Sequence, residues 1–519
     1  MPNIEAFGSR QKFGLIAGVL LFVIILLAPA PEGMSSEAKK MAAVVALMAS
    51  WWIFEATHIS VTSLIPIAAY PLLGIMPSSE VAPNYSNHLI YLFVGGFIMA
   101  LAMEKWNLHR RIALATIAQV GNDPKRLILG FMISTAFLSM WVSNTATTMM
   151  MLPVAMAVVT QMAQTALIDG ERDDKTPEEV RRGFGLVLLL SVAYGASIGG
   201  VATLVGTPTN VALLGFLAER FPENPPISFF QWSLVGFPIV LIFLPIAWLL
   251  LCRFGGPLSV GRIQFTATQS VIEEERQKLG SISGPEKSVL AASGCLALLW
   301  IFRQPIQVGF FTIPGWSEFF AYPRFLADAT VGILMSVILC LIPVRGGRGM
   351  EWKGRREFFV MDWRTIQTGL PWGIVILFGG GFALAAGMRE TGLAQWIGSL
   401  LSGLEGTSML IIFPVACALA TFLTEITSNT ATILMMSPVL AEAAIELGIH
   451  PYLLLIPTTI MASFAFMLPV ATPPNAVVFS SGWITIPQMV RAGILLDIMA
   501  VIIVPIVVYF LGGAVFQFR

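Results

Sequence analysis

Charged residues are scarce in this chain. Asp, Glu, Lys and Arg make up only 12% of its 519 residues, hydrophobic residues make up 56%, and the mean hydropathy is +0.80. Soluble domains carry roughly twice that share of charge, so the composition excludes an ordinary soluble protein. The 30 basic and 30 acidic residues cancel, and a net charge of zero gives no electrostatic reason to expect a nucleic-acid partner.

Cysteine and histidine are also rare, with four of each. Cys252, Cys295, Cys340 and Cys417 lie in or beside apolar runs without metal or redox spacing, so we expect packed, reduced thiols. The sequence lacks the phosphate-binding loop G-x-x-x-x-G-K-[ST], which excludes a process driven directly by ATP hydrolysis within this chain. An enzyme is disfavoured, because the polar segments described below have neither a His/Asp/Glu metal cluster nor a nearby His to activate their serines.

Apolar runs, by contrast, are plentiful. Runs close to the ~20 residues that cross a bilayer recur along the whole chain, which predicts an all-helical, multi-pass membrane protein. Arg10 and Lys12 precede the first run, but that run is long for a signal peptide, so we interpret it as a retained helix. The predicted apolar segments are 13–30, 41–56, 59–76, 89–104, 126–166, 184–219, 228–252, 287–303, 326–343, 368–389, 407–446, 451–482 and 487–512.

Two of these segments contain the same polar sequence. Ser-Asn-Thr-Ala-Thr occurs at 143–147 and again at 428–432, an offset of 285 residues. The same offset carries Phe93, Gly95, Gly96 and Phe97 onto identical residues, without a gap over roughly sixty positions. The chain therefore contains an internal duplication. Matching helix breaks in the two halves of a membrane protein are the best sequence indication of a transporter's binding site.

A second pair of breaks interrupts 184–219 at Gly206-Thr207-Pro208 and 451–482 at Ala471-Thr472-Pro473. Proline stops a helix, so each segment should form two half-helices joined by unwound chain. Backbone carbonyls with Ser, Thr and Asn oxygens suit an alkali cation, and helix N-termini favour an anion. Helix capping alone could explain one Ser-Asn-Thr segment. It does not explain two such segments that occur together with two Thr-Pro breaks. The pattern favours two cation sites with an anion between them.

The loop charges predict an orientation. If 126–166 and 407–446 are re-entrant hairpins with polar tips, eleven spans remain, and a cytoplasmic N-terminus places most Lys and Arg in the cytoplasm and the C-terminus outside. Five spans separate equivalent points of the duplication, so it is inverted. The predicted divisions are an N-terminal helix and loop (1–40), a first inverted repeat (41–252), a cytoplasmic connecting segment with a helix on the membrane (253–286) and a second inverted repeat (287–519).

A few acids lie inside or beside the apolar segments. Glu425 precedes the second polar segment, and we expect a packed, hydrogen-bonded or solvent-facing side chain there, with a proton or cation role as the less favoured alternative. Glu55, Asp328 and Asp497 are expected at interfacial positions near helix ends.

With these motifs the sequence resembles a known family, the divalent anion/sodium symporters that carry di- and tricarboxylates. The resemblance covers nearly the whole chain and rests on both Ser-Asn-Thr segments, Phe93–Phe97, Glu104–Arg111 and the two Thr-Pro breaks. It implies eleven transmembrane helices, two opposed re-entrant hairpins, a homodimer with a scaffold domain in each protomer, and elevator movement of a transport domain in the plasma (inner) membrane.

The resemblance also implies roles for individual residues. The first Na+ site would use Ser139, Ser143, Asn144 and the Gly206 carbonyl, and the second would use Thr424, Ser428, Asn429 and the Ala471 carbonyl. Substrate carboxylates would meet Ser143, Asn144, Thr145, Ser428, Asn429 and Thr430, with Thr207, Pro208, Thr472 and Pro473 shaping the walls. No Lys or Arg lies within about ten residues of any break, so bound Na+ would supply the positive charge that the anion needs.

The favoured function is therefore secondary-active import of C4-dicarboxylates (succinate, fumarate, malate) coupled to two or more co-transported Na+ ions, without an organic cofactor. A dicarboxylate exchanger on the same fold remains open, as does a Na+-coupled citrate or sulfate transporter. A channel is disfavoured, because a duplicated site with opposed hairpins suits alternating access better. The groups expected to bind the carboxylates are mostly backbone groups and small hydroxyls, so the sequence does not identify one substrate.

Overall fold

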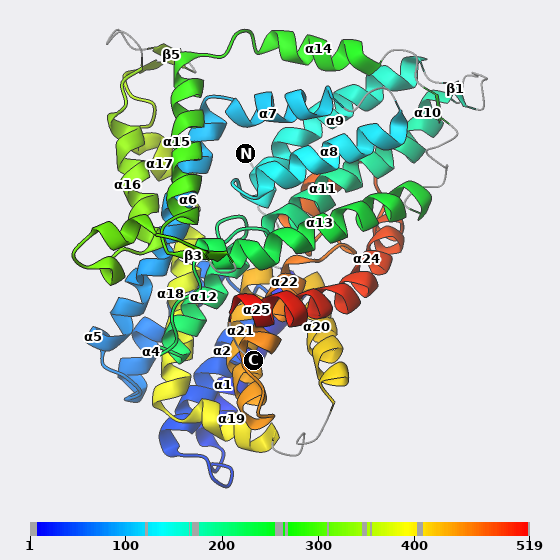
Figure 1. Ribbon diagram of the computed structural model, residues 1–519. Coiled ribbons are helices and arrows are strands. Elements are labelled where there is room, and N and C mark those ends of the chain that lie inside the picture. Colours follow the sequence, from blue (N-terminus) through cyan, green and yellow to red (C-terminus); the bar gives the residue numbers. More distant parts are fainter. Residues whose placement is uncertain are drawn as a thin grey trace.

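The chain folds into packed helices that run in several directions (Figure 1). The computed structural model describes residues 8–119, 123–165, 167–168, 176–254, 263–264, 268–308, 311–344, 350–352, 355–401 and 408–516. Within these ranges the strands form three short antiparallel pairs that lie between helices. They are β1 (Leu167–Ile168) with β2 (Ile263–Gln264), β3 (Ile306–Val308) with β4 (Phe311–Ile313), and β5 (Met350–Trp352) with β6 (Arg355–Glu357).

The helices follow one another through both halves of the chain. Those of the first half are α1 (Ser9–Leu27), α2 (Ser36–Ile53), α3 (Ile59–Thr62), α4 (Ile65–Leu73), α5 (Ser78–Val81), η1 (Ala82–Ser86), α6 (His88–Lys105), α7 (Leu108–Ile117), α8 (Pro124–Ser139), α9 (Asn144–Thr165), α10 (Thr176–Val180), η2 (Arg181–Gly185), α11 (Leu186–Gly200), α12 (Pro208–Arg220) and α13 (Phe229–Phe254). Those that follow are α14 (Thr268–Lys278), α15 (Gly284–Ile301), η4 (Trp316–Phe319), η5 (Pro323–Phe325), α16 (Asp328–Leu341), α17 (Trp363–Gly369), α18 (Trp372–Glu390), α19 (Leu393–Leu401), α20 (Met409–Ile426), α21 (Asn429–Glu446), α22 (Tyr452–Ser463), α23 (Pro473–Phe479), α24 (Ile486–Val507), η7 (Val508–Gly512) and α25 (Gly513–Val515).

Many of these helices are long and apolar. In the part of the chain that the structure describes, seven helices are long and apolar enough to cross a bilayer, and four apolar helices are shorter. Large apolar side chains also point outward, such as Leu27 (82% exposed) on α1 and Leu72 (85% exposed) on α4. A lipid-facing surface explains both properties, because lipid tails are as apolar as these side chains.

The predicted apolar segments agree with helices except at two prolines. We predicted one span at 59–76, but α3 ends at Thr62 and α4 begins at Ile65. Pro66 lacks an N–H to continue the hydrogen bonding of the preceding turn, but it is tolerated in the first turn of a new helix, so the segment divides. Pro371 divides the predicted span 368–389 into α17 and α18 in the same way.

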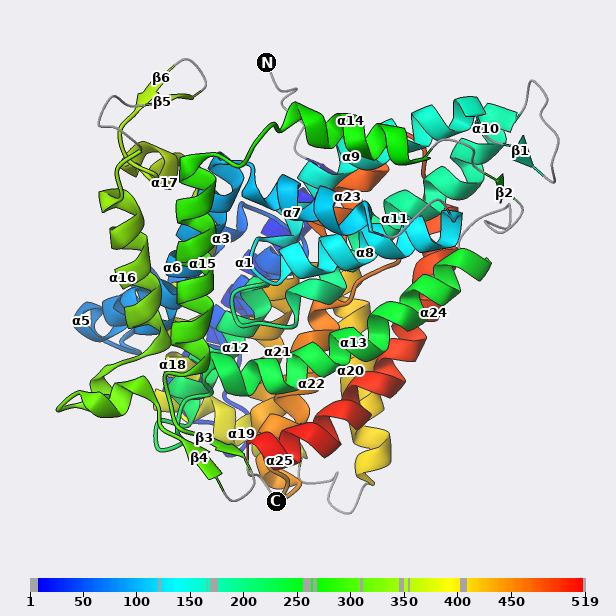
Figure 2. The ribbon, with the colours of Figure 1, turned by 45° about the horizontal axis from the view of Figure 1, so that its top comes forward.

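The helices that carry the two polar segments pack in corresponding ways. α11 lies against α8, α9 and α13, whereas α22 lies against α20, α21 and α24. Figure 2 shows α8, α11 and α13 beside one another, and α24 packs against α13. A separate group contains α6, α15 and α16, and there Gly95 and Gly332 let two backbones touch, since a Cβ on Gly95 would lie 2.6 Å from the Gly332 carbonyl carbon.

A buried lysine anchors the loop that follows α16. The Lys105 side chain at the end of α6 is fully buried, and its Nζ lies 2.9 Å from Glu357 and 2.7 Å from Asp362. Burial alone would raise the pKa of Asp362, but hydrogen bonds from Lys105 and Thr365 outweigh it and hold that pKa at about 2. A buried cation held by two carboxylates ties this loop to the helix group of α6.

The predicted connecting segment 253–286 contains a helix, as expected. This helix, α14, packs on α7 (Figure 2), where Arg110 pairs with Glu275. The next residue of α7, Arg111, pairs instead with Glu286 in the first turn of α15, with Nε 2.9 Å from the carboxylate. Residues 255–262 and 265–267 of the predicted segment lie outside the described residues.

Candidate functional site

Each Ser-Asn-Thr segment starts a helix immediately after another has ended. α8 ends at Ser139 and α9 begins at Asn144, and α20 and α21 are divided in the same way before Asn429. A hydroxyl at the end of the first helix reaches the asparagine that opens the second. Ser139 Oγ lies 2.6 Å from Asn144 Oδ1, and Thr424 Oγ1 lies 2.7 Å from Asn429 Oδ1. The structure thus repeats one contact at two positions 285 residues apart.

Oxygens converge on the first asparagine. The position of Asn144 Oδ1 is 2.6 Å from Ser139 Oγ and 3.2 Å from the carbonyl oxygens of both Ala196 and Gly206. With the amide turned over, all three atoms would lie within reach of its nitrogen, whose two hydrogens they would share. With the oxygen inward, Ser139 Oγ donates to Oδ1, but the carbonyl oxygens of Ala196 and Gly206 face Oδ1 without a donor, and a cation among them would make that arrangement favourable. Ligands about 2.4 Å from a shared cation lie roughly 3.4 Å apart, and the two separations of 3.2 Å from the carbonyl oxygens are close to that spacing.

The second asparagine has a related but different surrounding. Thr424 Oγ1, which contacts Asn429, also lies 2.6 Å from the carbonyl oxygen of Ala462 in α22. Ala471 is buried on the unwound chain, and its N–H donates to the Leu468 carbonyl over 3.2 Å. The contacts of the described residues therefore bring Gly206 to Asn144, whereas they do not join the Ala471 carbonyl to Asn429.

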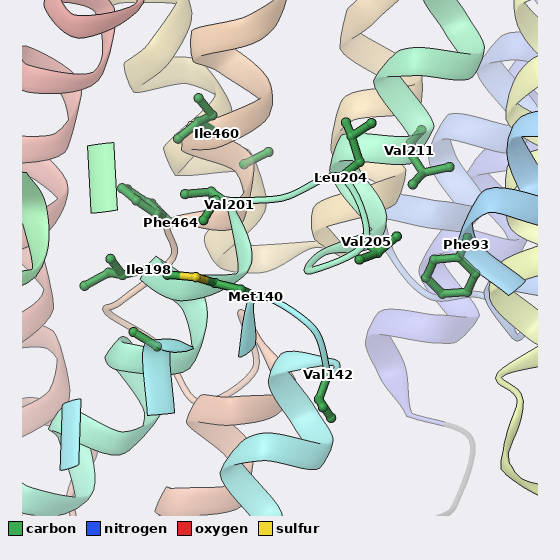
Figure 3. Packing of buried hydrophobic residues seen from close by; sticks show 14 of the residues in the cluster. Phe93, Met140, Val142, Ile198, Val201, Leu204, Val205, Val211, Ile460 and Phe464 are labelled. Atoms are coloured by element: carbon green, nitrogen blue, oxygen red, sulfur yellow. The ribbon is translucent and has the colours of Figure 1, made fainter. Parts of the chain in front are cut away.

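The unwound chain between each pair of half-helices is held by side chains. Thr203 Oγ1 donates to the Met140 carbonyl at the end of α8 and accepts from the Gly206 N–H. Asn210 donates to the Thr203 carbonyl, and Asn475, its counterpart, donates to the carbonyls of Ala465 and Leu468. Apolar residues surround this region, and Figure 3 shows Met140, Val142 and Val205 near the connection after α11. These bonds keep irregular chain from exposing unpaired backbone groups to lipid.

The two breaks are joined across the duplication. Thr209 Oγ1 lies 2.6 Å from Ser463 Oγ at the end of α22 and 3.2 Å from Thr207 Oγ1. This contact between hydroxyl groups links the first half of the chain to the second.

The predicted site residues differ in exposure. Those that are buried, and so can act as ligands or walls only from within the protein, are Ser139, Gly206, Thr207, Thr424, Thr430, Ala471 and Thr472. Those that keep exposed surface are Ser143, Asn144, Thr145, Pro208, Ser428, Asn429 and Pro473. The polar tips therefore stay accessible, whereas the hydroxyls behind them are enclosed.

The electrostatics of the site come mainly from the backbone. α9, α12 and α21 begin at Asn144, Pro208 and Asn429, so their positive helix ends lie at the breaks. One basic side chain near the second break was not predicted from the sequence. Arg10 donates to the carbonyls of Ile53 and Ile426, each over 2.7 Å, which places a guanidinium at the end of α20, two residues before Ser428.

Two acids near the second break have definite places. Glu425 is 2% exposed and accepts hydrogen bonds from backbone amides, as the packed, hydrogen-bonded interpretation predicted. The interfacial position predicted for Asp497 is wrong, since this residue lies in the middle of α24 and is 4% exposed. Asp328 does begin a helix, but it is buried against Arg303. Among the described residues no three His, Cys, Asp or Glu gather to hold a metal ion.

Known proteins match this chain over nearly its full length. The family model for the sodium:sulfate symporter transmembrane region matches residues 9–516. The sodium-dependent dicarboxylate transporter SdcS of Staphylococcus saprophyticus is 38% identical over 507 residues, which cover 98% of this chain and 92% of the relative. The Na(+)/dicarboxylate cotransporter 3 of Mus musculus is 38% identical over 558 residues, which cover 96% of this chain and 92% of the relative.

Solved transporter structures share the fold at low sequence identity. The Alcanivorax borkumensis YdaH transporter aligns with a TM-score of 0.52 and 13% identity over 83% of this chain and 87% of its own. Neisseria gonorrhoeae MtrF aligns with a TM-score of 0.51 and 14% identity over 97% of this chain and 95% of its own. From the family match and the two relatives, this chain belongs to the sodium:sulfate symporter family of multi-pass membrane transporters and is not an enzyme.

Proposed function

We propose that this protein imports C4-dicarboxylates such as succinate, fumarate and malate by secondary active transport coupled to Na+. The observation that carries the proposal is the repeated contact of a hydroxyl with an asparagine oxygen, Ser139 with Asn144 and Thr424 with Asn429, at the start of a helix. The names of the two relatives support sodium as the coupling ion and a dicarboxylate as the substrate.

We assign each cluster to one sodium ion. The convergence of oxygens on Asn144 supports a first site formed by Ser139, Ser143, Asn144 and the Gly206 carbonyl. The contacts of Thr424 support a second site formed by Thr424, Ser428 and Asn429, to which Ala471 contributes a carbonyl. Neutral oxygens suit Na+, because a singly charged ion does not need carboxylates to offset its charge.

The substrate carboxylates bind between these ions. The polar segments offer Ser143, Asn144, Thr145, Ser428 and Asn429, which keep exposed surface, and Thr430, which is buried; the walls are Thr207, Pro208, Thr472 and Pro473. Helix ends alone provide only partial positive charge there. Sodium must therefore bind for the dianion to be stable, and this requirement couples the two fluxes.

The corresponding packing of α8, α11 and α13 and of α20, α22 and α24 supports an inverted-repeat architecture. In this architecture eleven helices span the membrane, and α8–α9 and α20–α21 enter as re-entrant hairpins from opposite sides, with the N-terminus cytoplasmic and the C-terminus outside. The scaffold of a homodimer includes the helix group of α6, α15 and α16, and the helices that carry the two polar segments move as an elevator. A cross-link that is formed only in one state, between the scaffold and the hairpins, would test this movement.

We expect radiolabelled succinate to enter proteoliposomes only with sodium outside. Unlabelled fumarate and malate should compete strongly, because both keep two carboxylates at the spacing of succinate, whereas sulfate should compete weakly. Competition by sulfate or citrate that exceeds competition by fumarate would reassign the substrate while leaving the sodium coupling in place.

The pH dependence of uptake should follow the substrate. Two carboxylates bridge the two polar segments, and among the proposed site residues none is Lys, Arg or His. We therefore expect uptake at a fixed total succinate concentration to fall as the pH drops through the second pKa of succinate, since the dianion disappears. Uptake that rises with the monoanion concentration would contradict dianion recognition, and the sodium dependence measured at each pH is the control.

A further inference from the structure

Arg10 joins the ends of two helices from distant parts of the chain. Its Nη2 donates hydrogen bonds to the carbonyls of Ile53 and Ile426, each over 2.7 Å. Ile53 is the last residue of α2, and Ile426 is the last residue of α20. The final carbonyls of a helix have no partner within it, and the negative end of the helix dipole lies there. One guanidinium therefore serves two helix ends, and both of them favour a cation.

The base from which Arg10 extends is rigid. The backbone of α1 comes close to α2, since a Cβ on Gly14 would lie 2.2 Å from the Cβ of Phe54. The Ser50 hydroxyl donates to the Gly14 carbonyl over 3.2 Å, and the rings of Phe13 and Phe54 meet edge to face with their centroids 5.1 Å apart. These contacts hold α1 and α2 together as one unit, which we call the α1–α2 pair.

The other acceptor belongs to the second hairpin, which is formed by α20 and α21. α20 packs on α21, α22 and α24, the helices that carry and surround the second break. Ile426 ends α20, and only Thr427 and Ser428 separate it from the start of α21. The contact is therefore made at the tip of the hairpin. Arg10 ties this tip to the α1–α2 pair, which is a different group of helices.

The contact is specific and can be opened. Lys12 lies two residues further along α1 and is also exposed, but its side chain makes no hydrogen bond or ion pair with the described residues. Positive charge at this end of α1 is thus not enough to produce the contact. Arg10 is exposed, so water can replace the two carbonyls when the contact breaks. A buried pair such as Arg303 with Asp328 would leave unpaired charges in the interior.

The contact defines the position of the second hairpin in the proposed architecture. With the N-terminus cytoplasmic, the start of α1 and the end of α2 both lie toward the cytoplasm. The second hairpin enters from outside, yet its tip reaches these cytoplasmic ends through Arg10. The hairpin therefore stands at its innermost position, which is the inward-facing state of an elevator.

We propose that Arg10 is a positioning residue for transport, which fastens the tip of the second hairpin to the α1–α2 pair in the inward-facing state and releases it when the hairpin moves outward. This role rests on the proposed function, which requires that movement. The fastened carbonyl lies two residues before Ser428, so its release frees the second oxygen cluster to move with the tip. Loss of Arg10 then shifts the protein toward the outward-facing state, where external sodium binds.

Distances between two spin labels measure this shift without sodium or a dicarboxylate. The labels are attached through Leu20→Cys on α1 and Val415→Cys on α20, two side chains that are more than half exposed, after the four native cysteines are replaced by alanine. In lipid we expect a main distance from the inward-facing state and a minor one from the outward-facing state. Arg10→Gln should lower the ratio of main to minor population severalfold. Arg10→Lys should restore most of it, because an ammonium can also donate to both carbonyls.

Lys12→Gln is the matched control. It removes the same charge from the same end of α1 but breaks no contact with the described residues, so both distances and their populations should stay unchanged. Uptake adds a second readout. The half-saturating external sodium concentration for succinate uptake by Arg10→Gln should fall severalfold, because more of the protein presents its sites to the outside. Damage to a sodium site would raise this concentration instead.

An Arg10→Gln protein with the distance distribution of the unsubstituted protein would overturn the proposal, even where succinate uptake proves to be sodium-dependent. An equal shift in Lys12→Gln, or a half-saturating sodium concentration in Arg10→Gln that stays the same or rises, would overturn it as well. Failure of the proposed substrate is a separate result, since a protein that carries another anion would still show the change in distance.

Discussion

Replacing either asparagine at the helix starts should abolish transport. Asn144→Ala and Asn429→Ala each remove an oxygen that we place on a sodium ion and on the substrate. Losing one charge-assisted ligand costs about 1.5–3 kcal/mol, or roughly ten- to a hundredfold in affinity. Because both ions create the anion site, the two variants should be about equally impaired and the double variant little worse. The measurement is sodium-titrated succinate uptake, normalised to folded protein in the membrane.

Thr424→Ser is the matched control for this pair. Serine already occupies the corresponding position 139 and makes the same contact with an asparagine, so sodium-dependent uptake should remain. Normal transport by Asn144→Ala together with a dead Asn429→Ala would show that the two clusters do not act as a symmetric pair.

Adding one methyl group at Gly200 should disable the first sodium site without unfolding the protein. A Cβ at this position would overlap Oδ1 of Asn144 and lie 3.1 Å from its Cγ and Nδ2. The end of an asparagine side chain can rotate away, so the helix survives while the ligand is displaced. We expect Gly200→Ala to approach Asn144→Ala, with roughly tenfold or greater loss of sodium affinity in the same uptake assay.

Gly294→Ala provides the comparison. Gly294 also lies in a helix, α15, but a Cβ there would have no neighbouring atom within 4 Å. Its transport and sodium affinity should be unchanged. If Gly200→Ala behaves like Gly294→Ala, the oxygens around Asn144 do not bind the ion.

The sequence predicted the features that depend on local chemistry. A proline removes a backbone donor wherever it stands, so the breaks before Pro208 and Pro473 could be located in advance. The same rule would have divided 59–76 at Pro66, where apolar length was given too much weight. The duplicated Ser-Asn-Thr segments likewise fixed where α9 and α21 begin.

Contacts between distant parts of the chain could not be predicted. Arg10 reaches the Ile426 carbonyl across 416 residues, and no local pattern couples these positions. Thr209 and Ser463 meet only because α12 and α22 pack together. Asp497 was misplaced because its burial depends on which face of α24 turns toward α20, and an apolar helix with few polar residues does not reveal that face.

The most direct test of sodium-coupled import is uptake by proteoliposomes that contain unlabelled succinate. Labelled succinate is added outside with either sodium or choline. The oxygen clusters, read as sodium sites that complete the anion site, predict rapid uptake with sodium and almost none with choline. Equal uptake in the two solutions would contradict sodium coupling and identify an obligate dicarboxylate exchanger.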